Sequence, residues 1–227
     1  MGFRCSVRRI ATLFVNFALC FAIFAQPSYG QARIDEHENE VGKFRAERDR
    51  EFRDSKESPL EAAELSLFEG LSYFKINPKF RVPARFSRTP DEKKFNMPTS
   101  SGITKVYLKY GELRFSLEGR DQVLGVYQSE ALAKTEKYKN YLLIPFRDAT
   151  SGKETYGGGR YIDFEIPAGD VVTLDFNLAY NPSCAYSHRY NCPIPPRENR
   201  LPIKIKAGEK NYRKLAETSQ SARAAKN

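Results

Sequence analysis

The chain is poor in the residues on which many metal centres and disulfide-rich scaffolds depend. Its 227 residues include no Trp, two Met, two His and four Cys. The two histidines, His37 and His188, are too few to supply an obvious full ligand set for zinc. The chain also lacks an internal repeat and has no helix-length segments alternating with its strand-like runs. The second absence excludes a doubly wound α/β fold.

The sequence also lacks a concentrated patch of one charge. The formal net charge is +9, but Arg4, Arg8 and Arg9 lie in the leader discussed next, so the rest of the chain is nearer 9 − 3 = +6. Acidic residues are interleaved with the bases nearly everywhere, which disfavours nucleic-acid binding. We expect a solvated basic surface, with anionic lipid or an acidic glycan as the alternative partners. Hydrophobic residues make up 41% of the chain, which supports a packed core.

Residues 1–30 have the three parts of a secretory signal. A basic MGFRCSVRR precedes an apolar IATLFVNFALCFAIFA, and QPSYG supplies small residues before a cut. The apolar run is about 16 residues, shorter than the roughly 20 that a spanning helix needs. We therefore predict an exported protein, periplasmic or secreted, cleaved after Gly30 or Ala32 and without a transmembrane segment afterwards. A retained membrane anchor is the alternative.

Cleavage would leave Cys184 and Cys192 as the remaining cysteines. An oxidising compartment favours a disulfide between them, and because the closed loop is short it would contribute roughly 2–3 kcal/mol. The equal spacing of Cys184, His188 and Cys192 also permits a zinc site on these three residues, although no fourth ligand is evident. No cofactor is expected.

The N-terminal part reads as helical. Residues 31–57 are dense in charge, and Ile34, Val41, Phe44 and Phe52 fall on a loose helical stripe. Ser58 begins a capping-box motif that predicts a second helix running to about Phe68. At the other end, residues 213–227 are polar and are expected to form a flexible tail.

Residues 58–212 are predicted to form a single β-rich domain. From Phe80 the hydrophobic period changes to two; Leu113, Phe115 and Leu117 alternate with polar residues, as in an antiparallel sheet with one wet face. The fold class is therefore mainly β, an antiparallel barrel or sandwich of about eight or nine short strands with two N-terminal helices. The expected strands are 80–87, 93–98, 103–111, 112–119, 122–129, 141–146, 160–166, 171–177 and 202–206.

Three long polar blocks in the second half carry a family resemblance. They read FRDATSGKETYGGGRY, DFNLAYNPSCAY and CPIPPRENRLPIKIKAGEK. Together they resemble the bacterial and archaeal domain of unknown function family 1684, over about Ser58 to Lys210. The resemblance implies no reaction, ligand or catalytic residue, so a site has to be argued from the chemistry of the residues.

The segment from Arg147 to Arg200 is dense in Arg, Asn, Asp and Tyr, and we expect its loops to gather at one rim of the sheet. The leading hypothesis is a non-catalytic binding or structural module of the cell envelope that recognises a small polar or anionic ligand. The glycines at 157–159 could turn backbone amides toward an anion, or they could form a glycine-rich bulge. The candidate ligand-binding residues are Arg147, Arg160, Asn177, Tyr180 and Asn181.

A carboxylate pair is the alternative source of function. If Asp148 and Asp175 face one cavity, they could act as acid and base in a hydrolase-like enzyme, which requires a separation of roughly 5–10 Å. Both carboxylates could instead be tied to arginines or loop amides. The sequence leaves open whether the protein is an enzyme, and it leaves the oligomeric state open.

Overall fold

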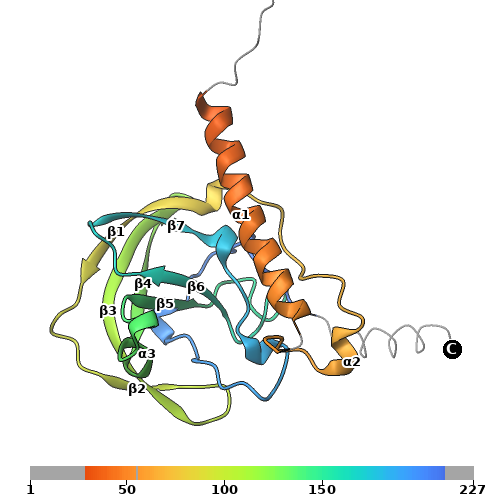
Figure 1. The fold of residues 1–227 in the computed structure, drawn as a ribbon. Helices are drawn as coiled ribbons and strands as arrows, with labels where there is room; N and C mark the ends of the chain where they lie inside the picture. The colour runs from red at the N-terminus through yellow and green to blue at the C-terminus, as the bar shows by residue number, and fades with distance from the viewer. Residues whose placement is uncertain (1–28, 55, 213–227) are drawn as a thin grey trace, which may run out of the picture.

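The computed structural model describes residues 29–54 and 56–212. The predicted signal peptide, apart from its last two residues, and the predicted C-terminal tail therefore lie outside the described residues. The long helix α1 (Tyr29–Arg53) lies beside a curled antiparallel sheet (Figure 1). The strands are β1 (Arg81–Arg88), β2 (Phe95–Pro98), β3 (Thr104–Leu117), β4 (Arg120–Ser129), β5 (Tyr141–Phe146), β6 (Arg160–Glu165) and β7 (Val171–Asp175).

The remaining helical elements are short. Two are single α-helical turns, α2 (Ala62–Leu65) and α3 (Glu130–Ala133). The others are 3₁₀ turns, namely η1 (Pro78–Phe80), η2 (Glu136–Tyr138), η3 (Phe176–Leu178), η4 (Ser183–Ala185) and η5 (Arg197–Asn199).

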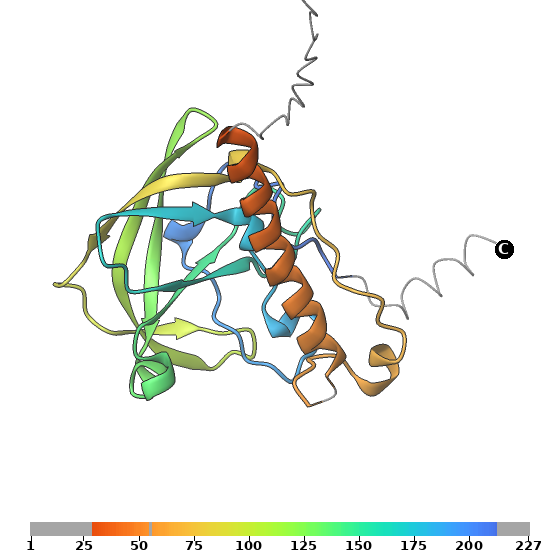
Figure 2. The ribbon, with the colours of Figure 1, turned by 45° about the horizontal axis from the view of Figure 1, so that its top comes forward.

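All strand pairs in the described sheet are antiparallel. The strand order is β6-β5-β4-β3-β1-β7, with β2 paired to β3. β6 and β7 follow each other in sequence yet stand at opposite ends of this order. A single bridge between Tyr161 and Tyr180 brings the chain after β7 back to β6, and Figures 1 and 2 show the resulting curl. The prediction of a mainly antiparallel β fold is confirmed as an open, curled barrel, with seven strands where eight or nine were expected.

Part of the difference in strand count comes from Gly111. The two strands expected at 103–111 and 112–119 form one strand, β3, with a bulge between Lys109 and Gly111. A Cβ at Gly111 would lie 2.6 Å from the Phe86 ring and from the Ser87 carbonyl oxygen. This glycine therefore permits close packing of β3 on β1 and does not mark a turn.

Two other expected elements differ from the prediction. Residues 202–206 are not a strand, although Ile203 and Ile205 are buried. The Ile203 carbonyl oxygen accepts the Ala149 N–H at 2.9 Å, and the backbone of Ile205 is bound by side chains, as described below. The helix expected up to Phe68 is reduced to α2, because the Ser58 hydroxyl accepts the Leu60 N–H at 3.2 Å in a local turn and α2 begins only after Glu61.

The sheet packs on both faces. Leu113, Phe115 and Leu117 lie in the main core inside the curl, as the alternation predicts, together with Ile144 and Phe146. A second cluster lies on the opposite face, because alternate residues of a strand point to opposite sides. That second cluster contains Met97, Tyr107, Tyr127, Leu143 and Tyr161.

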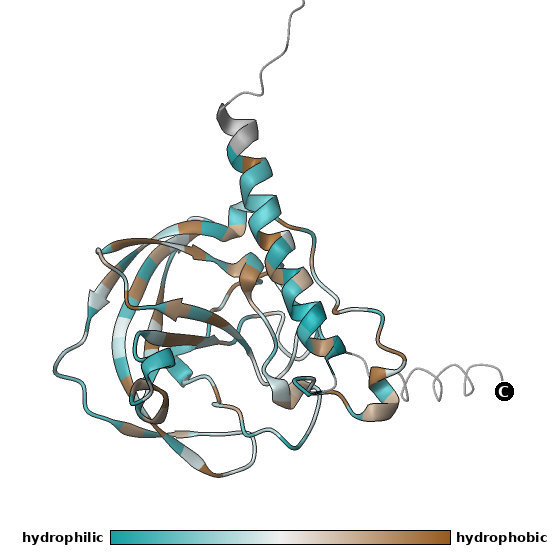
Figure 3. Ribbon diagram, in the orientation of Figure 1, coloured by the Kyte–Doolittle hydropathy of each residue, from teal (hydrophilic) through white to brown (hydrophobic). Residues whose placement is uncertain are grey.

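Helix α1 is mostly hydrophilic (Figure 3) and docks through a narrow apolar seam. Val41 and Phe52 are buried, whereas Ile34 is 41% exposed. His37, on the same side of the helix, is also buried. In the described part of the chain, no helix combines the length and the hydrophobicity that a membrane crossing demands. The interface between α1 and the barrel is therefore largely polar.

Candidate functional site

The side chain of the predicted ligand-binding residue Arg160 is buried and binds other groups of the protein. Its side chain is 0% exposed and forms an ion pair with Asp148 at 3.5 Å. Its guanidinium donates to the carbonyl oxygens of Ile205, at 2.9 Å, and of Ala207 and Glu209. Arg160 therefore satisfies alternate carbonyl groups of the segment 205–209, which has no neighbouring strand to bind them. A ligand-binding role for Arg160 is not supported.

Asp148 completes the same buried centre. It accepts the Ile205 N–H at 2.6 Å and the Thr150 hydroxyl at 2.8 and 2.9 Å. Burial lowers the pKa of Arg160, and the charge of Asp148 opposes this change. The Asp148–Arg160 pair is thus a clamp that attaches the C-terminal segment to β6.

The second predicted carboxylate, Asp175, belongs to a different centre. Asp175 Oδ2 lies 2.6 Å from His37 Nε2 in α1, and its Oδ1 accepts the Asn177 N–H and side-chain amide at 2.8 Å. Asn177 in turn exchanges two hydrogen bonds of 2.9 Å with the backbone of Asn77. Among the described residues, Asp148 and Asp175 share no hydrogen-bond partner. Each is tied to its own neighbours, which is the non-catalytic alternative raised above.

At least one of the three amides at 157–159 is used within the loop. The Gly159 N–H donates to the Tyr156 carbonyl oxygen at 3.1 Å. Gly159 has φ +98°, and a Cβ there would lie 2.6 Å from the Phe146 carbonyl oxygen. The Arg147 Nε is also used locally, since it donates to the Gly158 carbonyl oxygen at 3.3 Å. Close approaches at Gly158 and Gly159 agree with a packing role for these two glycines.

Of the other two predicted residues, Asn181 binds a buried acid that sequence reasoning missed, whereas the Tyr180 hydroxyl donates to Asp163. Glu209 is 1% exposed. It accepts hydrogen bonds from the Asn181 N–H at 3.0 Å, from the Asn181 side-chain amide at 2.9 Å and from the Tyr186 hydroxyl. Arg48 of α1 lies 3.9 Å away and also covers the Tyr180 ring at 4.6 Å. Burial raises the pKa of Glu209, and the charge of Arg48 opposes this change.

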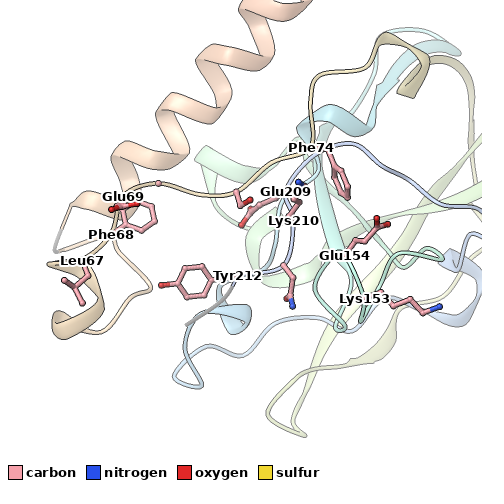
Figure 4. Close-up of a pocket in the computed structure, with 12 residues that line it drawn as sticks. Leu67, Phe68, Glu69, Phe74, Lys153, Glu154, Glu209, Lys210 and Tyr212 are labelled. Carbon is pink, nitrogen blue, oxygen red and sulfur yellow. The ribbon is translucent and has the colours of Figure 1, made fainter. Parts of the chain in front are cut away.

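A hollow of about 780 Å³ lies beside Glu209 (Figure 4). Its aromatic walls are Phe68, Phe74 and Tyr212. Figure 4 shows the Tyr212 ring extending from the C-terminal segment toward Leu67. The wall behind the hollow is a short ladder in which the Tyr73 backbone pairs with that of Glu209. The charged lining residues are Glu69, Lys153, Glu154, Glu209 and Lys210.

A second hollow, of about 840 Å³, lies at the end of the barrel. Its floor is formed by the core residues Phe80, Leu117 and Ile203. Its cationic lining residues are Lys79, Arg120, Lys204 and Lys206. These four cations are all exposed, and Lys206 is paired with Glu154 at 2.9 Å. The first hollow is the better candidate site, because three aromatic side chains and charged residues of both signs line it.

Cys184 and Cys192 are both free thiols in this structure. The Cys184 N–H donates to the Cys192 sulfur at 3.3 Å, and the Tyr156 hydroxyl lies 3.7 Å from the Cys184 sulfur. The hydrogen bond from the Cys192 side chain lowers the pKa of Cys184 to about 6. His188 is exposed, and the described residues contain no group of three metal-ligating side chains. The three residues proposed for zinc therefore do not converge here.

Asn199, near the end of the segment from Arg147 to Arg200, is a structural residue. It is 0% exposed. Its side-chain oxygen accepts the Gly125 N–H at 2.7 Å, and its amide donates to the carbonyl oxygens of Gly125 and Pro145 at 2.8 and 2.7 Å. β4 and β5 pair in register only at Tyr127 and Leu143. Because Pro145 has no N–H, Asn199 supplies bonds that the ladder lacks.

The comparisons with known proteins agree with this fold. The model of a family described as "Protein of unknown function (DUF1684)" matches residues 66–210. The chain is also similar to an uncharacterized protein of Haloarcula marismortui solved by NMR, with 36% sequence identity and a TM-score of 0.62. That match covers 79% of this chain and 96% of the archaeal one. No curated protein matches the chain.

Proposed function

This chain belongs to the DUF1684 family, and from that premise we propose that it is an exported, non-catalytic binding module of the cell envelope. Its ligand is a small polar molecule held in the hollow next to Glu209. The observation that carries the proposal is the combination of three aromatic side chains with lysines and glutamates around one cavity of about 780 Å³.

This composition suits a ligand with both an apolar face and polar edges. Ligand pockets are commonly about 300–1,000 Å³, with apolar and aromatic walls and a few polar groups that fix orientation. Phe68, Phe74 and Tyr212 provide the walls. The charged part of the lining includes two cations, Lys153 and Lys210, and two anions, Glu69 and Glu154. A mixed-charge lining favours a neutral or zwitterionic ligand over a polyanion.

The internal roles of Asp148 and Asp175 support the non-catalytic part of the proposal. Both carboxylates are buried, and neither lines the hollow. Their hydrogen bonds are made to Thr150 and Ile205 in one case and to His37 and Asn177 in the other. A carboxylate engaged in this way has no free access to a substrate proton.

The binding proposal is tested by amide chemical shifts. Purified ¹⁵N-labelled protein is titrated separately with neutral monosaccharides, zwitterionic amino acids and short dicarboxylates. We expect one of the first two classes to shift the amides of Gly70, Lys153 and Asn211. Tyr212→Ala removes an aromatic wall and should weaken that binding about tenfold or more, whereas Tyr138→Ala, away from the hollow, should leave it unchanged. If no class shifts these amides, or if both variants bind alike, the hollow is not a ligand site.

Export is tested on the same protein. Expression with the native leader in a Gram-negative host, followed by fractionation, should place the chain in the periplasm or the medium with Gln31 or Arg33 at its N-terminus. Exported material should also have a Cys184–Cys192 disulfide, so that a thiol count after denaturation rises only on reduction. An uncleaved chain in the cytoplasm would contradict export.

A further inference from the structure

A polar layer between α1 and the barrel contains nearly all the unsatisfied buried groups of the structure. Among the described residues, six buried side-chain nitrogen or oxygen atoms have no hydrogen-bond partner. Apart from Arg160 Nε, they all lie in this layer: Arg45 Nε and Nη2, Arg48 Nε, Tyr73 Oη and Asn181 Oδ1. Most buried polar atoms of native proteins have a hydrogen-bond partner. Five buried atoms without one in a single layer therefore point to a missing binding partner.

The most specific of these groups is the guanidinium of Arg45. Nε and Nη2 form one edge of the guanidinium fork, the edge that a carboxylate or phosphate takes with two parallel hydrogen bonds. The Arg45 guanidinium carbon lies 4.5 Å from the centroid of the Tyr73 ring. This stacking fixes the plane of the fork, and the Tyr73 hydroxyl adds a further unpaired donor to the layer.

The acidic residues near Arg45 are bound to other partners. The charge of Asp175 acts on Arg45 and raises its pKa, against the larger lowering by burial, but the Asp175 carboxylate is bound to His37 and Asn177. Glu209 is paired with Arg48, and burial raises the pKa of Glu209. Among the described residues, neither of these two carboxylates forms an ion pair with Arg45.

We propose that the Arg45 fork binds a small oxyanion, the carboxylate or phosphate group of a ligand, in the layer between α1 and the barrel. Tyr73 supplies a second donor and Arg48 adds positive charge. This site is separate from the hollow of the proposed function and does not depend on it. Because the Arg45 donor atoms are buried, the anion enters when α1 lifts from the barrel. Bound anion then links α1 to Tyr73 and holds the helix in place.

The test uses purified protein in sodium acetate, sodium phosphate or sodium chloride at equal ionic strength and pH. We expect acetate or phosphate to slow backbone hydrogen exchange across α1 by about fivefold or more relative to chloride, since a ligand that binds the closed state stabilises it. A response to acetate alone identifies a carboxylate ligand, and a response to phosphate alone identifies a phosphate group. The matched variants are Arg45→Lys, which keeps the charge but has no fork, and Arg50→Lys, whose side chain is 76% exposed on the same helix.

The wild-type protein and Arg50→Lys should respond to the oxyanion, whereas Arg45→Lys should respond equally to all three salts. Tyr73→Phe, which keeps the ring beneath the guanidinium, should retain a weaker response. The proposal is overturned if the wild type does not distinguish the oxyanions from chloride, or if Arg45→Lys still does. A crystal grown in saturating acetate and phosphate with only water at Nε and Nη2 would overturn it as well.

Discussion

His37 Nε2 and Asp175 Oδ2 lie 2.6 Å apart across 138 positions of sequence and join α1 to the end of β7. Both side chains are nearly inaccessible, at 3% and 8% exposure. The helix otherwise contributes few buried apolar residues, so this contact is a principal attachment of α1 to the sheet.

Replacement of His37 should loosen α1. His37→Ala leaves Asp175 Oδ2 without its closest partner, which costs about 1–3 kcal/mol for a buried group. We expect a lower free energy of unfolding together with faster hydrogen exchange along Val41 to Phe52. Glu38→Ala, at an exposed position of the same helix, serves as the control. Equal exchange in both variants would show that His37 does not hold the helix.

Loss of Arg160 should be severe. Arg160→Met leaves Asp148 as a buried, uncompensated charge, and removing one partner of a buried ion pair costs about 3–5 kcal/mol. Urea unfolding followed by circular dichroism measures the change. Arg114→Met removes an exposed arginine paired with Glu112 and should change stability by no more than about 0.5 kcal/mol. Comparable stabilities for the two variants would refute the clamp.

Asn199 offers an isosteric test. Asn199→Asp keeps the shape of the side chain but replaces its amide donor by an oxygen that faces the carbonyl groups of Gly125 and Pro145. We expect a loss of about 2–4 kcal/mol in the free energy of unfolding, since two buried acceptors lose their donor and a charge is buried. An Asp variant as stable as the wild type at neutral pH would contradict this role.

Glu209 should give stability an unusual pH dependence. Burial raises its pKa above the ordinary 4.5, so the folded state binds the proton more tightly than the unfolded state. The resulting stabilisation is fully present below pH 4.5 and is lost as the pH rises through the folded-state pKa. Its size is about 1.4 kcal/mol for each tenfold difference in proton affinity between the folded and unfolded states. Glu209→Gln abolishes this titration.

The measurement for Glu209 is a difference between two stability curves. The free energy of unfolding of Glu209→Gln minus that of the wild type should increase as the pH rises above 4.5. Glu118→Gln, at an exposed position, provides the reference. Parallel curves for wild type and Glu209→Gln would mean that the buried carboxyl group does not titrate differently on folding.

Cys184 should be the more reactive thiol of reduced protein. The hydrogen bond from Cys192 lowers its pKa to about 6, while the pKa of Cys192 is raised by its partner. Alkylation by iodoacetamide, followed by peptide mass spectrometry, should therefore label Cys184 first, with a half-maximal rate near that pH. Cys192→Ala should slow the labelling of Cys184 at mildly acidic to neutral pH, because the stabilising hydrogen bond is gone. Faster labelling of Cys192 would disprove the assignment.

The strands could be predicted where hydrophobic alternation is local. Leu113, Phe115 and Leu117 are buried as their spacing indicates, and 141–146 and 160–166 correspond to β5 and β6. Gly111 misled the prediction, because a glycine that ends a strand and one that permits close packing inside a strand look alike in sequence. Only the position of Phe86 on the neighbouring strand distinguishes them.

The roles of the polar residues depended on contacts far away in sequence. Arg160 was expected to face a ligand, but its partners lie 45 to 49 positions later in the chain. Glu209 gave no signal, since a lone acid in a charged C-terminal stretch reads as exposed. The apolar alternation of Leu201, Ile203 and Ile205, which led to the predicted strand at 202–206, did correctly indicate that the last segment lies inside the fold.

The clamp formed by Arg160 also affects the order in which the newly synthesised chain can fold. A nascent polypeptide that ends before Ile205 has synthesised Arg160 and Asp148 but none of the carbonyl groups that solvate the guanidinium. Closing the barrel at that stage would strand a cation in a dry interior. The closed barrel is therefore expected to become stable only after residues 205–209 have been synthesised and can reach Arg160.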